Sequence, residues 1–183
     1  MKLANNPRAI WLLGFVGFIE AIFFPIPPDV LLIPMILANI NKAWLYALVT
    51  TISSVLGGLV GYAIGLFAFA QIAEPLLIGL GKQSAINLFS NSINENGFLI
   101  VLTAGISPIP FKVVSVMSGF TQMPIHVFLV SALLGRAIRF FLVATLLKRY
   151  GEKIKSFIET YLGWLFLFFI ALIVVGTLGL DFL

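Results

Sequence analysis

The stretch PIPPDV, residues 25–30, places three prolines and an aspartate inside a strongly apolar sequence. AIWLLGFVGFIEAIFF comes before it and LLIPMILANI follows it. A proline inside a helix removes a backbone donor and clashes with the preceding turn, so residues 9–39 cannot form one straight helix. We expect a helix that breaks at Pro25, Pro27 and Pro28, with the acid Asp29 beside the break.

The overall composition indicates an all-α integral membrane protein. Of its 183 residues, 61% are hydrophobic and only 10% are charged, and the mean hydropathy is +1.12. Soluble domains are nearer half apolar and a quarter charged, so lipid must cover part of this surface. The net charge of +4 fits basic loops that face anionic lipid. Neither a stacking motif nor a basic stripe points to nucleic acid as a partner.

The chain has no cysteine. Disulfides, thiol catalysis and metals held by cysteine are therefore excluded. The sequence contains no HExxH motif, and no serine pairs obviously with its single histidine. We therefore expect no cofactor, no metal and no enzymatic activity, although an intramembrane enzyme stays open as a weaker alternative.

Three segments are long enough to cross a bilayer, which takes about 20 apolar residues. Residues 43–70 carry no charge, whereas residues 126–147 contain Arg136 and Arg139. Residues 161–180 form a third, uncharged segment near the C-terminus. We expect a transmembrane helix in each of the three.

A second apolar region, residues 98–123, is broken at Pro108 and Pro110. The pieces beside each break have about 10–17 residues, too few to cross the membrane at about 1.5 Å per residue. Irregular backbone survives at membrane depth only where protein or water covers it. We therefore expect residues 9–39 and 98–123 to form re-entrant hairpins, each entering and leaving on one face of the membrane.

Two further segments alternate apolar and polar residues at helical spacing, which indicates amphipathic helices on the membrane surface. They are residues 71–97 and 149–161. The length of the chain favours a single membrane domain over residues 1–183. Its expected parts are a first half, 1–70 (hairpin 9–39 and span 43–70), the surface segment 71–97, a second half, 98–148 (hairpin 98–123 and span 126–147), and a surface helix with the last span, 149–183.

The two breaks resemble each other. Aligning PIPPDV with PIPFKV, residues 108–113, places Asp29 opposite Lys112. A long apolar span follows each motif after about 12 residues, and paired interrupted segments are typical of the internal repeats of transporters. Chance recurrence of short proline-rich motifs is the alternative interpretation.

The basic residues predict the orientation of these halves, because cytoplasmic loops are enriched in lysine and arginine. They place the N-terminus in the cytoplasm, residues 71–97 outside, and the two hairpins on opposite faces. On this arrangement Asp29 would approach Lys112 near the middle of the bilayer. The residues that carry the argument are Lys2, Arg8, Lys42, Lys148, Arg149, Lys153 and Lys155 inside, against Lys82, Glu74 and Glu95 outside.

Five charged residues lie in or beside the apolar segments: Glu20, Asp29, Lys112, Arg136 and Arg139. Each would cost at least about 2.5–3.5 kcal/mol if it faced lipid alone, so we expect a paired cluster that forms a substrate or proton pathway. Its surplus positive charge suits an anionic substrate, and arginine binds phosphate through two parallel hydrogen bonds.

Simpler interpretations stay open for these residues. Arg136 and Arg139 are three positions apart on one helix face, and a purely structural ion pair would also explain them. Asp29 would be a good N-cap for the helix that follows it. Glu20 has no such local explanation, which favours a proton-carrying role.

Three glycines four residues apart, Gly57, Gly61 and Gly65, form one face of the first span. Small residues at this spacing allow a neighbouring helix to approach closely, so we expect this face to be a packing surface. Overall, the sequence favours a transporter. A structural or assembly protein of the membrane is the alternative, and a homo-oligomer stays open.

Several of these motifs together resemble the DedA family, also called SNARE-associated or VTT-domain proteins. They are E-x4-PIPPDVLL at 20–32, G-x3-GY-x2-G at 57–65 and SPIPFKVVSVMSG-x3-MP at 107–124. The stretch GRAIRFFLVA at 135–144 is similar to a small bacterial branch, the YqaA-like proteins.

The resemblance implies two opposed re-entrant hairpins, a cavity within the membrane and transport or scrambling of lipids. In bacterial members it implies an inner-membrane protein that recycles undecaprenyl phosphate or phospholipid, with coupling to protons. The acidic pair of the family corresponds to Glu20 and Asp29. Many members have an arginine at each end of an R-F-x-P-x-x-R stretch, where this chain has Ser107 and Val113. The basic chemistry would then come from the three cations of the cluster.

Overall fold

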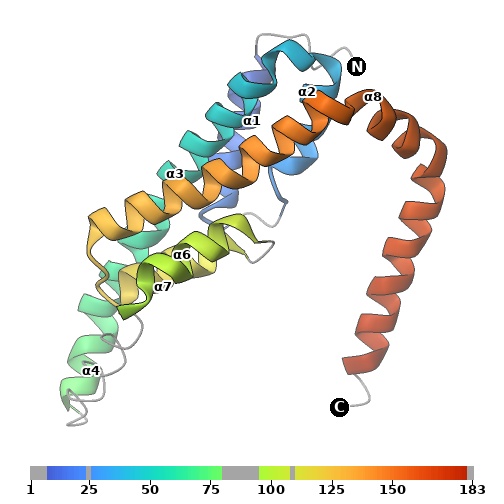
Figure 1. The fold of residues 1–183 in the computed structure, drawn as a ribbon. Coiled ribbons are helices and arrows are strands. Elements are labelled where there is room, and N and C mark those ends of the chain that lie inside the picture. Colours follow the sequence, from blue (N-terminus) through green and yellow to red (C-terminus); the bar gives the residue numbers. More distant parts are fainter. Residues whose placement is uncertain (1–7, 24–25, 80–94, 108–109, 181–183) are drawn as a thin grey trace.

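Every regular element in the computed structural model is a helix throughout the residues that it describes, 8–23, 26–79, 95–107 and 110–180 (Figure 1). The side chains of the last helix are described as far as Lys153. The elements are α1 (Ala9–Glu20), α2 (Asp29–Ala38), the 3-10 turn η1 (Ile40–Lys42), α3 (Ala43–Ala68), the π-helical turn η2 (Phe69–Ala73), α4 (Glu74–Gly79), α6 (Gly97–Ile106), α7 (Phe111–Phe120) and α8 (Ile125–Leu180).

Two helical stretches among the described residues have the length and hydropathy of membrane spans, Ile40–Ile72 and Ile125–Gly151. The helices α1, α2, α6 and α7 are apolar but have only 10 to 12 residues. A helix of that length reaches about 15–18 Å, well short of a hydrocarbon core of about 30 Å. The predicted all-α membrane fold is confirmed at this level.

Prolines mark the start of the second helix in each broken region. Pro28 precedes the first residue of α2, and Pro110 precedes the first residue of α7. Backbone N–H groups in the first turn of a helix have no intrahelical acceptor, so a proline there costs no hydrogen bond. Pro27 directly precedes Pro28, and its carbonyl oxygen accepts a hydrogen bond from the Val30 N–H. Pro25 and Pro108 lie outside the described residues.

The short helices α1 and α7 both pack along α3. The carbonyl oxygen of Phe18 in α1 lies where a side chain at Gly57 would be, and that of Val116 in α7 lies where one at Gly65 would be. Gly61 faces Ser115 of α7 in the same way. The glycine face of α3 therefore holds α1 against its first part and α7 against its second.

The other two short helices pack along α8. Gly105 of α6 meets Gly135, where a Cβ would lie 3.0 Å from the opposing Cα. Farther along α8, Gly151 meets Leu37 of α2. The first helix of each broken region thus packs on the long helix of its own half, and the second packs on the long helix of the other half. Described residues at the broken ends of the two regions consequently meet around α8, as the contacts of Lys112 with Phe23 and of Arg139 with Asp29 and Ser107 show.

Buried apolar residues form two clusters. One joins α1, α2, α3 and α8 around Leu13, Ile36 and Phe140, and the other joins α3, α7 and α8 around Phe111 and Phe128. Many large apolar side chains point outward instead, and Trp11 is 80% exposed. Such a surface is covered by lipid in an integral membrane protein.

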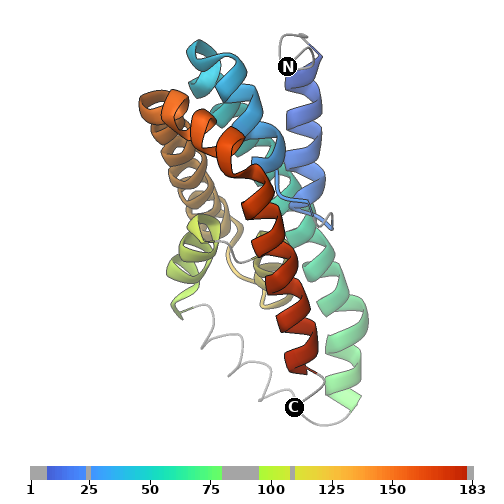
Figure 2. The ribbon, with the colours of Figure 1, turned by 90° about the vertical axis from the view of Figure 1, so that its right-hand side faces the viewer.

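Two boundaries differ from the sequence-based expectation. The helical run that begins with α3 continues through η2 and α4 to Gly79, beyond the expected end at residue 70. The predicted surface helix 149–161 is not a separate element, because α8 continues through it without a proline to end it. Instead α8 changes direction between its first part (orange) and its last part (red) (Figures 1 and 2).

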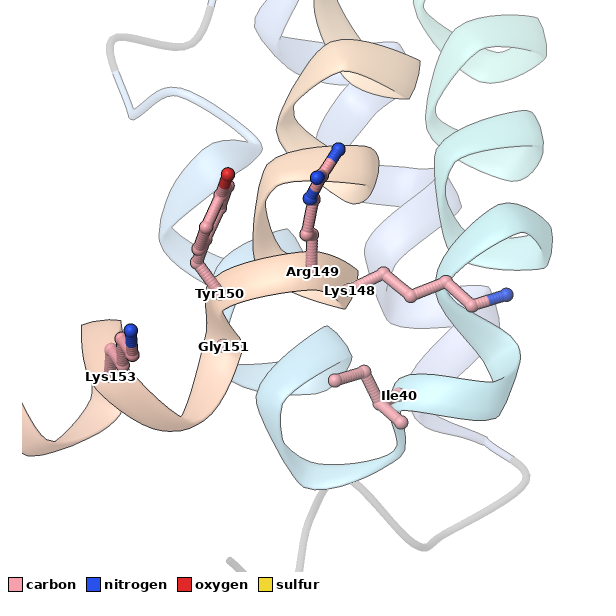
Figure 3. Close-up of a pocket in the computed structure, with 6 residues that line it drawn as sticks. All are labelled: Ile40, Lys148, Arg149, Tyr150, Gly151 and Lys153. Carbon is pink, nitrogen blue, oxygen red and sulfur yellow. The ribbon is translucent and has the colours of Figure 1, made fainter.

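This change of direction lies next to η1 (Figure 3). The side chains of the predicted third span, 161–180, and residues 80–94 of the predicted surface segment lie outside the described part of the chain, so both stay predictions.

Candidate functional site

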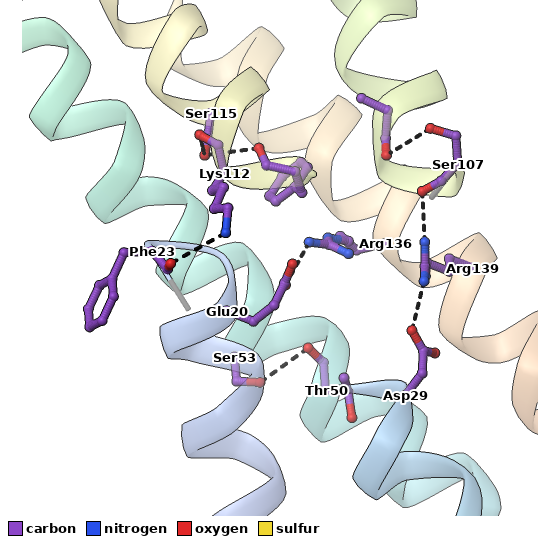
Figure 4. A network of polar contacts seen from close by, with 12 residues as sticks. Glu20, Phe23, Asp29, Thr50, Ser53, Ser107, Lys112, Ser115, Arg136 and Arg139 are labelled. Carbon is purple, nitrogen blue, oxygen red and sulfur yellow. Dashed lines mark hydrogen bonds and ion pairs between the residues drawn. The ribbon is translucent and has the colours of Figure 1, made fainter. Parts of the chain in front are cut away.

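A buried ion pair joins the end of α1 to the first part of α8 (Figure 4). The Nη2 atom of Arg136 lies 3.0 Å from a carboxylate oxygen of Glu20. The side chains of Arg136 and Glu20 are only 4% and 12% exposed. Glu20 is the last residue of α1, so the break that follows it places its carboxylate within reach of α8.

A second ion pair lies one helical turn farther along α8. One nitrogen of Arg139 donates to the Asp29 carboxylate over 2.7 Å, and the other terminal nitrogen donates to the Ser107 carbonyl over 2.7 Å. Asp29 begins α2, and Ser107 is the residue after the last of α6. One guanidinium group therefore ties together the broken ends of both regions.

Lys112 completes the cluster from the start of α7. Its ammonium group donates to the carbonyl oxygen of Phe23, beyond the end of α1, over 3.3 Å. Asp29 itself pairs with Arg139, and the predicted approach of Lys112 to Asp29 stays a prediction. The alignment of the two motifs identifies the breaks as neighbours, but it cannot identify cations that α8 brings to the same place.

Asp29 is not the N-cap residue of α2, which was the alternative explanation for it. The N-cap residue of α2 is Pro28, and no side-chain hydrogen bond caps this end. Asp29 lies in the first turn instead. A carboxylate there interacts favourably with the helix dipole, while its hydrogen bond goes to Arg139.

Helix ends of both signs converge on the cluster. The N-terminus of α2 presents partial positive charge to Asp29, and the carbonyl ends of α1 and α6 present partial negative charge to Lys112 and Arg139. These contacts satisfy carbonyl groups that the helix breaks leave without intrahelical partners. The breaks and the charges therefore stabilise each other.

Aromatic rings enclose the Arg136 guanidinium. Its central carbon lies 4.2 Å from the centre of the Phe111 ring and 5.6 Å from that of Phe140. Both rings are fully buried. Sequence analysis missed these two residues, although each had a signal. Phe140 follows Arg136 by four positions on the same helix face, and Phe111 lies directly beside Lys112 in the PIPFKV motif.

The two guanidinium groups retain unused hydrogen-bonding capacity. The Nε atoms of Arg136 and Arg139 are buried and have no hydrogen-bond partner among the described residues. Guanidinium offers five N–H donors in a planar fork, and buried donors without partners are rare in proteins. The cluster thus has donors available for the oxygen atoms of a bound anion.

The chemistry of the cluster is that of ion pairing. Within the described residues, no three acidic or histidine side chains come close enough to hold a metal ion. Two acids and three bases leave one surplus positive charge at the centre of the helix bundle. At either arginine, an anionic group of a bound molecule could take the place of the paired carboxylate.

Comparison with known proteins agrees with this architecture. The description of the VTT domain matches residues 26–149, which include α2, α3, α6, α7 and most of the apolar part of α8. The matched region contains Asp29, Lys112, Arg136 and Arg139, and it begins six residues after Glu20.

The chain is also similar over most of its length to several proteins that carry the name "uncharacterized". It is 39% identical to one from Haemophilus influenzae over 168 residues, which cover 90% of this chain and 86% of the relative. A protein from Methanocaldococcus jannaschii is 32% identical over 124 residues, which cover 68% of this chain and 74% of that protein. No solved structure matches the chain.

Proposed function

The chain belongs to the VTT-domain family, the DedA family of membrane proteins, and from this premise we propose that it transports a lipid or a lipid-linked anion across the bilayer. The substrate would be a phospholipid or a polyprenyl phosphate. The observation that supports this proposal most directly is the set of two ion pairs, one buried and one partly buried, where the broken helices meet. Charged groups inside a membrane bundle are costly and typically mark substrate or proton pathways.

The position of the cluster agrees with a transport site. Interrupted helices commonly form the substrate sites of transporters near the middle of the bilayer, with their ends directed at charged groups. Here the ends of α1, α2, α6 and α7 all lie beside the cluster. We propose that both broken regions are re-entrant, entering from opposite membrane faces.

A phosphate group would bind by exchange with a carboxylate. Arg139 holds Asp29 through one nitrogen, and a phosphate offers it the bidentate partner that guanidinium prefers. Asp29 would then be left without its cation in surroundings where an isolated charge is costly, so it would take up a proton. Arg136 and Glu20 would exchange in the same way. Substrate binding would thus be coupled to proton uptake.

The proposed setting is the inner membrane of a bacterium, with the N-terminus in the cytoplasm. The basic residues before the first long span and after the second support this orientation through the positive-inside rule. The two halves would present the cluster alternately to each face.

Reconstitution into liposomes tests the proposal. The purified full chain is inserted into vesicles that contain fluorescent phospholipid or labelled polyprenyl phosphate, and the fraction of label reached by an external quencher is followed in time. We expect flipping by the unchanged chain, and at least a tenfold slower rate in Arg136→Gln and Arg139→Gln, because loss of a phosphate contact of this kind removes at least about 1.4 kcal/mol of binding.

Arg8→Gln is the matched control, since it removes the same charge from an exposed position outside the cluster. It should flip lipid at the unchanged rate. Absence of flipping by the unchanged chain with every substrate, or equal rates in all variants, would rule out the proposal.

A structural or assembly role without transport is the second candidate. The enclosure of Arg136 between two buried rings favours it, because such packing also stabilises a fixed bundle. The two candidates differ in one outcome. Under the structural role, any variant that folds supports the growth of cells as well as the unchanged chain does, including those with the cluster altered.

A further inference from the structure

Basic residues gather where α8 passes the start of the first apolar span, Ile40–Ile72. Lys148, Arg149 and Lys153 lie on α8 here, and Lys42 ends η1. A Cβ at Gly151 would lie 3.2 Å from Leu37 and 3.4 Å from Ile40, so the backbone of α8 rests directly on the end of α2 and on η1. Basic residues next to a membrane span favour the headgroup region, so this contact marks one boundary of the hydrocarbon region.

Aromatic residues mark the same boundary. Trp44 and Tyr150 are both exposed there, and such rings concentrate at the level of the lipid headgroups. Lys148 lies with its ammonium nitrogen 5.6 Å from the centre of the Trp44 ring. Two independent features, the basic residues and the aromatic rings, thus place this part of the molecule among the headgroups.

A cavity of about 420 Å³ lies at this level (Figure 3). The described residues of its lining include three cations and no acid: Ile40, Lys148, Arg149, Tyr150, Gly151 and Lys153. Its volume falls in the range of small-molecule sites, about 300–1,000 Å³. The three cations are exposed and have no carboxylate within 4.0 Å among the described residues.

We infer that this cavity binds the phosphate of an anionic phospholipid whose acyl chains lie along the adjoining apolar helices. Lysine and arginine would contact the phosphate, while Ile40 and Tyr150 would pack against the glycerol backbone. A lipid fits better than a soluble anion, because the cavity lies beside the start of the span Ile40–Ile72 and among exposed aromatic rings. The site is separate from the Arg136 and Arg139 cluster, and it does not depend on transport.

Native mass spectrometry of the full chain in detergent tests this inference, with phosphatidylglycerol and phosphatidylcholine as probes. We expect tighter binding of phosphatidylglycerol. Each charge near the surface contributes roughly a fivefold change in affinity for anionic lipid. Lys148→Gln and Arg149→Gln should each weaken phosphatidylglycerol binding about fivefold, and the double variant about 25-fold. Arg8→Gln, outside the cavity, should leave it unchanged.

Competition with inorganic phosphate distinguishes a lipid phosphate from a free phosphate ion as the occupant of the cavity. If a lipid is the occupant, millimolar phosphate leaves bound phosphatidylglycerol in place. Displacement by free phosphate, equal binding of both lipids, or equal affinity in the charge variants and in Arg8→Gln would each overturn the inference. Failure of lipid flipping would not affect it, since retention of lipid is measured without transport.

Discussion

Arg136 lies 3.0 Å from Glu20, although 116 positions separate them in the chain. The acid belongs to the first half and the arginine to the second. The pair of Asp29 and Arg139 crosses between the halves in the same direction, over 110 positions. Both ion pairs therefore hold the two halves together, and any movement of one half against the other must carry or break them.

Removing one partner of the buried pair should destabilise the protein strongly. Glu20→Gln leaves the charge of Arg136 buried without compensation, which typically costs about 3–5 kcal/mol. The free energy of unfolding in mixed micelles should fall by about that amount. The fluorescence of the three tryptophans provides the signal.

Removing both partners should cost less than removing one. Apolar residues of similar volume often replace a buried ion pair without loss of stability, so Glu20→Leu with Arg136→Leu should be more stable than Glu20→Gln alone. Arg8→Gln serves as the exposed control. A double variant less stable than the single variant would show that the pair itself, rather than the uncompensated charge, dominates the stability.

Arg139→Lys should separate charge from geometry in the cluster. Arginine reaches Asp29 and the Ser107 carbonyl with two nitrogens at once, whereas lysine has one ammonium group and cannot form the planar fork. We expect the variant to fold but to flip lipid at least tenfold more slowly in liposomes. A rate equal to that of the unchanged chain would mean that positive charge alone suffices.

The broken helices could be predicted because proline has a direct local effect. The spacing of prolines and apolar residues identified α1, α2, α6 and α7 as short helices. The continuation of α3 to Gly79 and of α8 past residue 149 could not be predicted in this way. Amphipathic periodicity is the same in a surface helix and in the extension of a span, so only a helix-breaking residue would have separated them.

The members of the charged cluster could also be predicted, since buried charge is costly in a membrane and must be compensated. The partners within the cluster could not. Asp29 pairs with Arg139 because α2 packs along α8, and this exchange of helices between the halves has no local signal. The carbonyls of Phe23 and Ser107 are backbone groups, which carry no sequence signal.

A methyl group at Gly65 should disrupt the packing of α7 on α3. The carbonyl oxygen of Val116 occupies the place of that methyl group, and backbone cannot move aside as a flexible side chain can. Gly65→Ala should therefore lower the free energy of unfolding by about 1–3 kcal/mol, as overpacking does. Gly79→Ala is the matched control, because no atom of the described part of the chain beyond its neighbours lies within 4 Å of the added atom, and we expect no loss of stability there.

The hydrogen bond from the Tyr62 hydroxyl to the Met123 carbonyl should contribute measurably to stability. It spans 2.5 Å, is buried, and joins α3 to the turn before α8. Tyr62→Phe removes the donor and keeps the ring, so we expect a loss of about 1–3 kcal/mol from the carbonyl left without its partner. Tyr150→Phe, at an exposed position, should change the free energy of unfolding by less than about 0.5 kcal/mol.

Cysteine cross-linking should test how the second broken region lies on the first half. The chain has no cysteine of its own, so an introduced pair reacts without background. A Cβ at Gly61 would lie 3.3 Å from that of Ser115, close to the separation of about 3.5–4.5 Å in disulfides. Gly61→Cys with Ser115→Cys should oxidise readily and join α3 to α7.

A protease site introduced between residues 80 and 94 makes this disulfide visible, because the two fragments stay together until they are reduced. Gly61→Cys with Val113→Cys is the control, since Val113 is exposed on α7. Fragments that separate in the first pair, or stay together equally in both pairs, would contradict this packing.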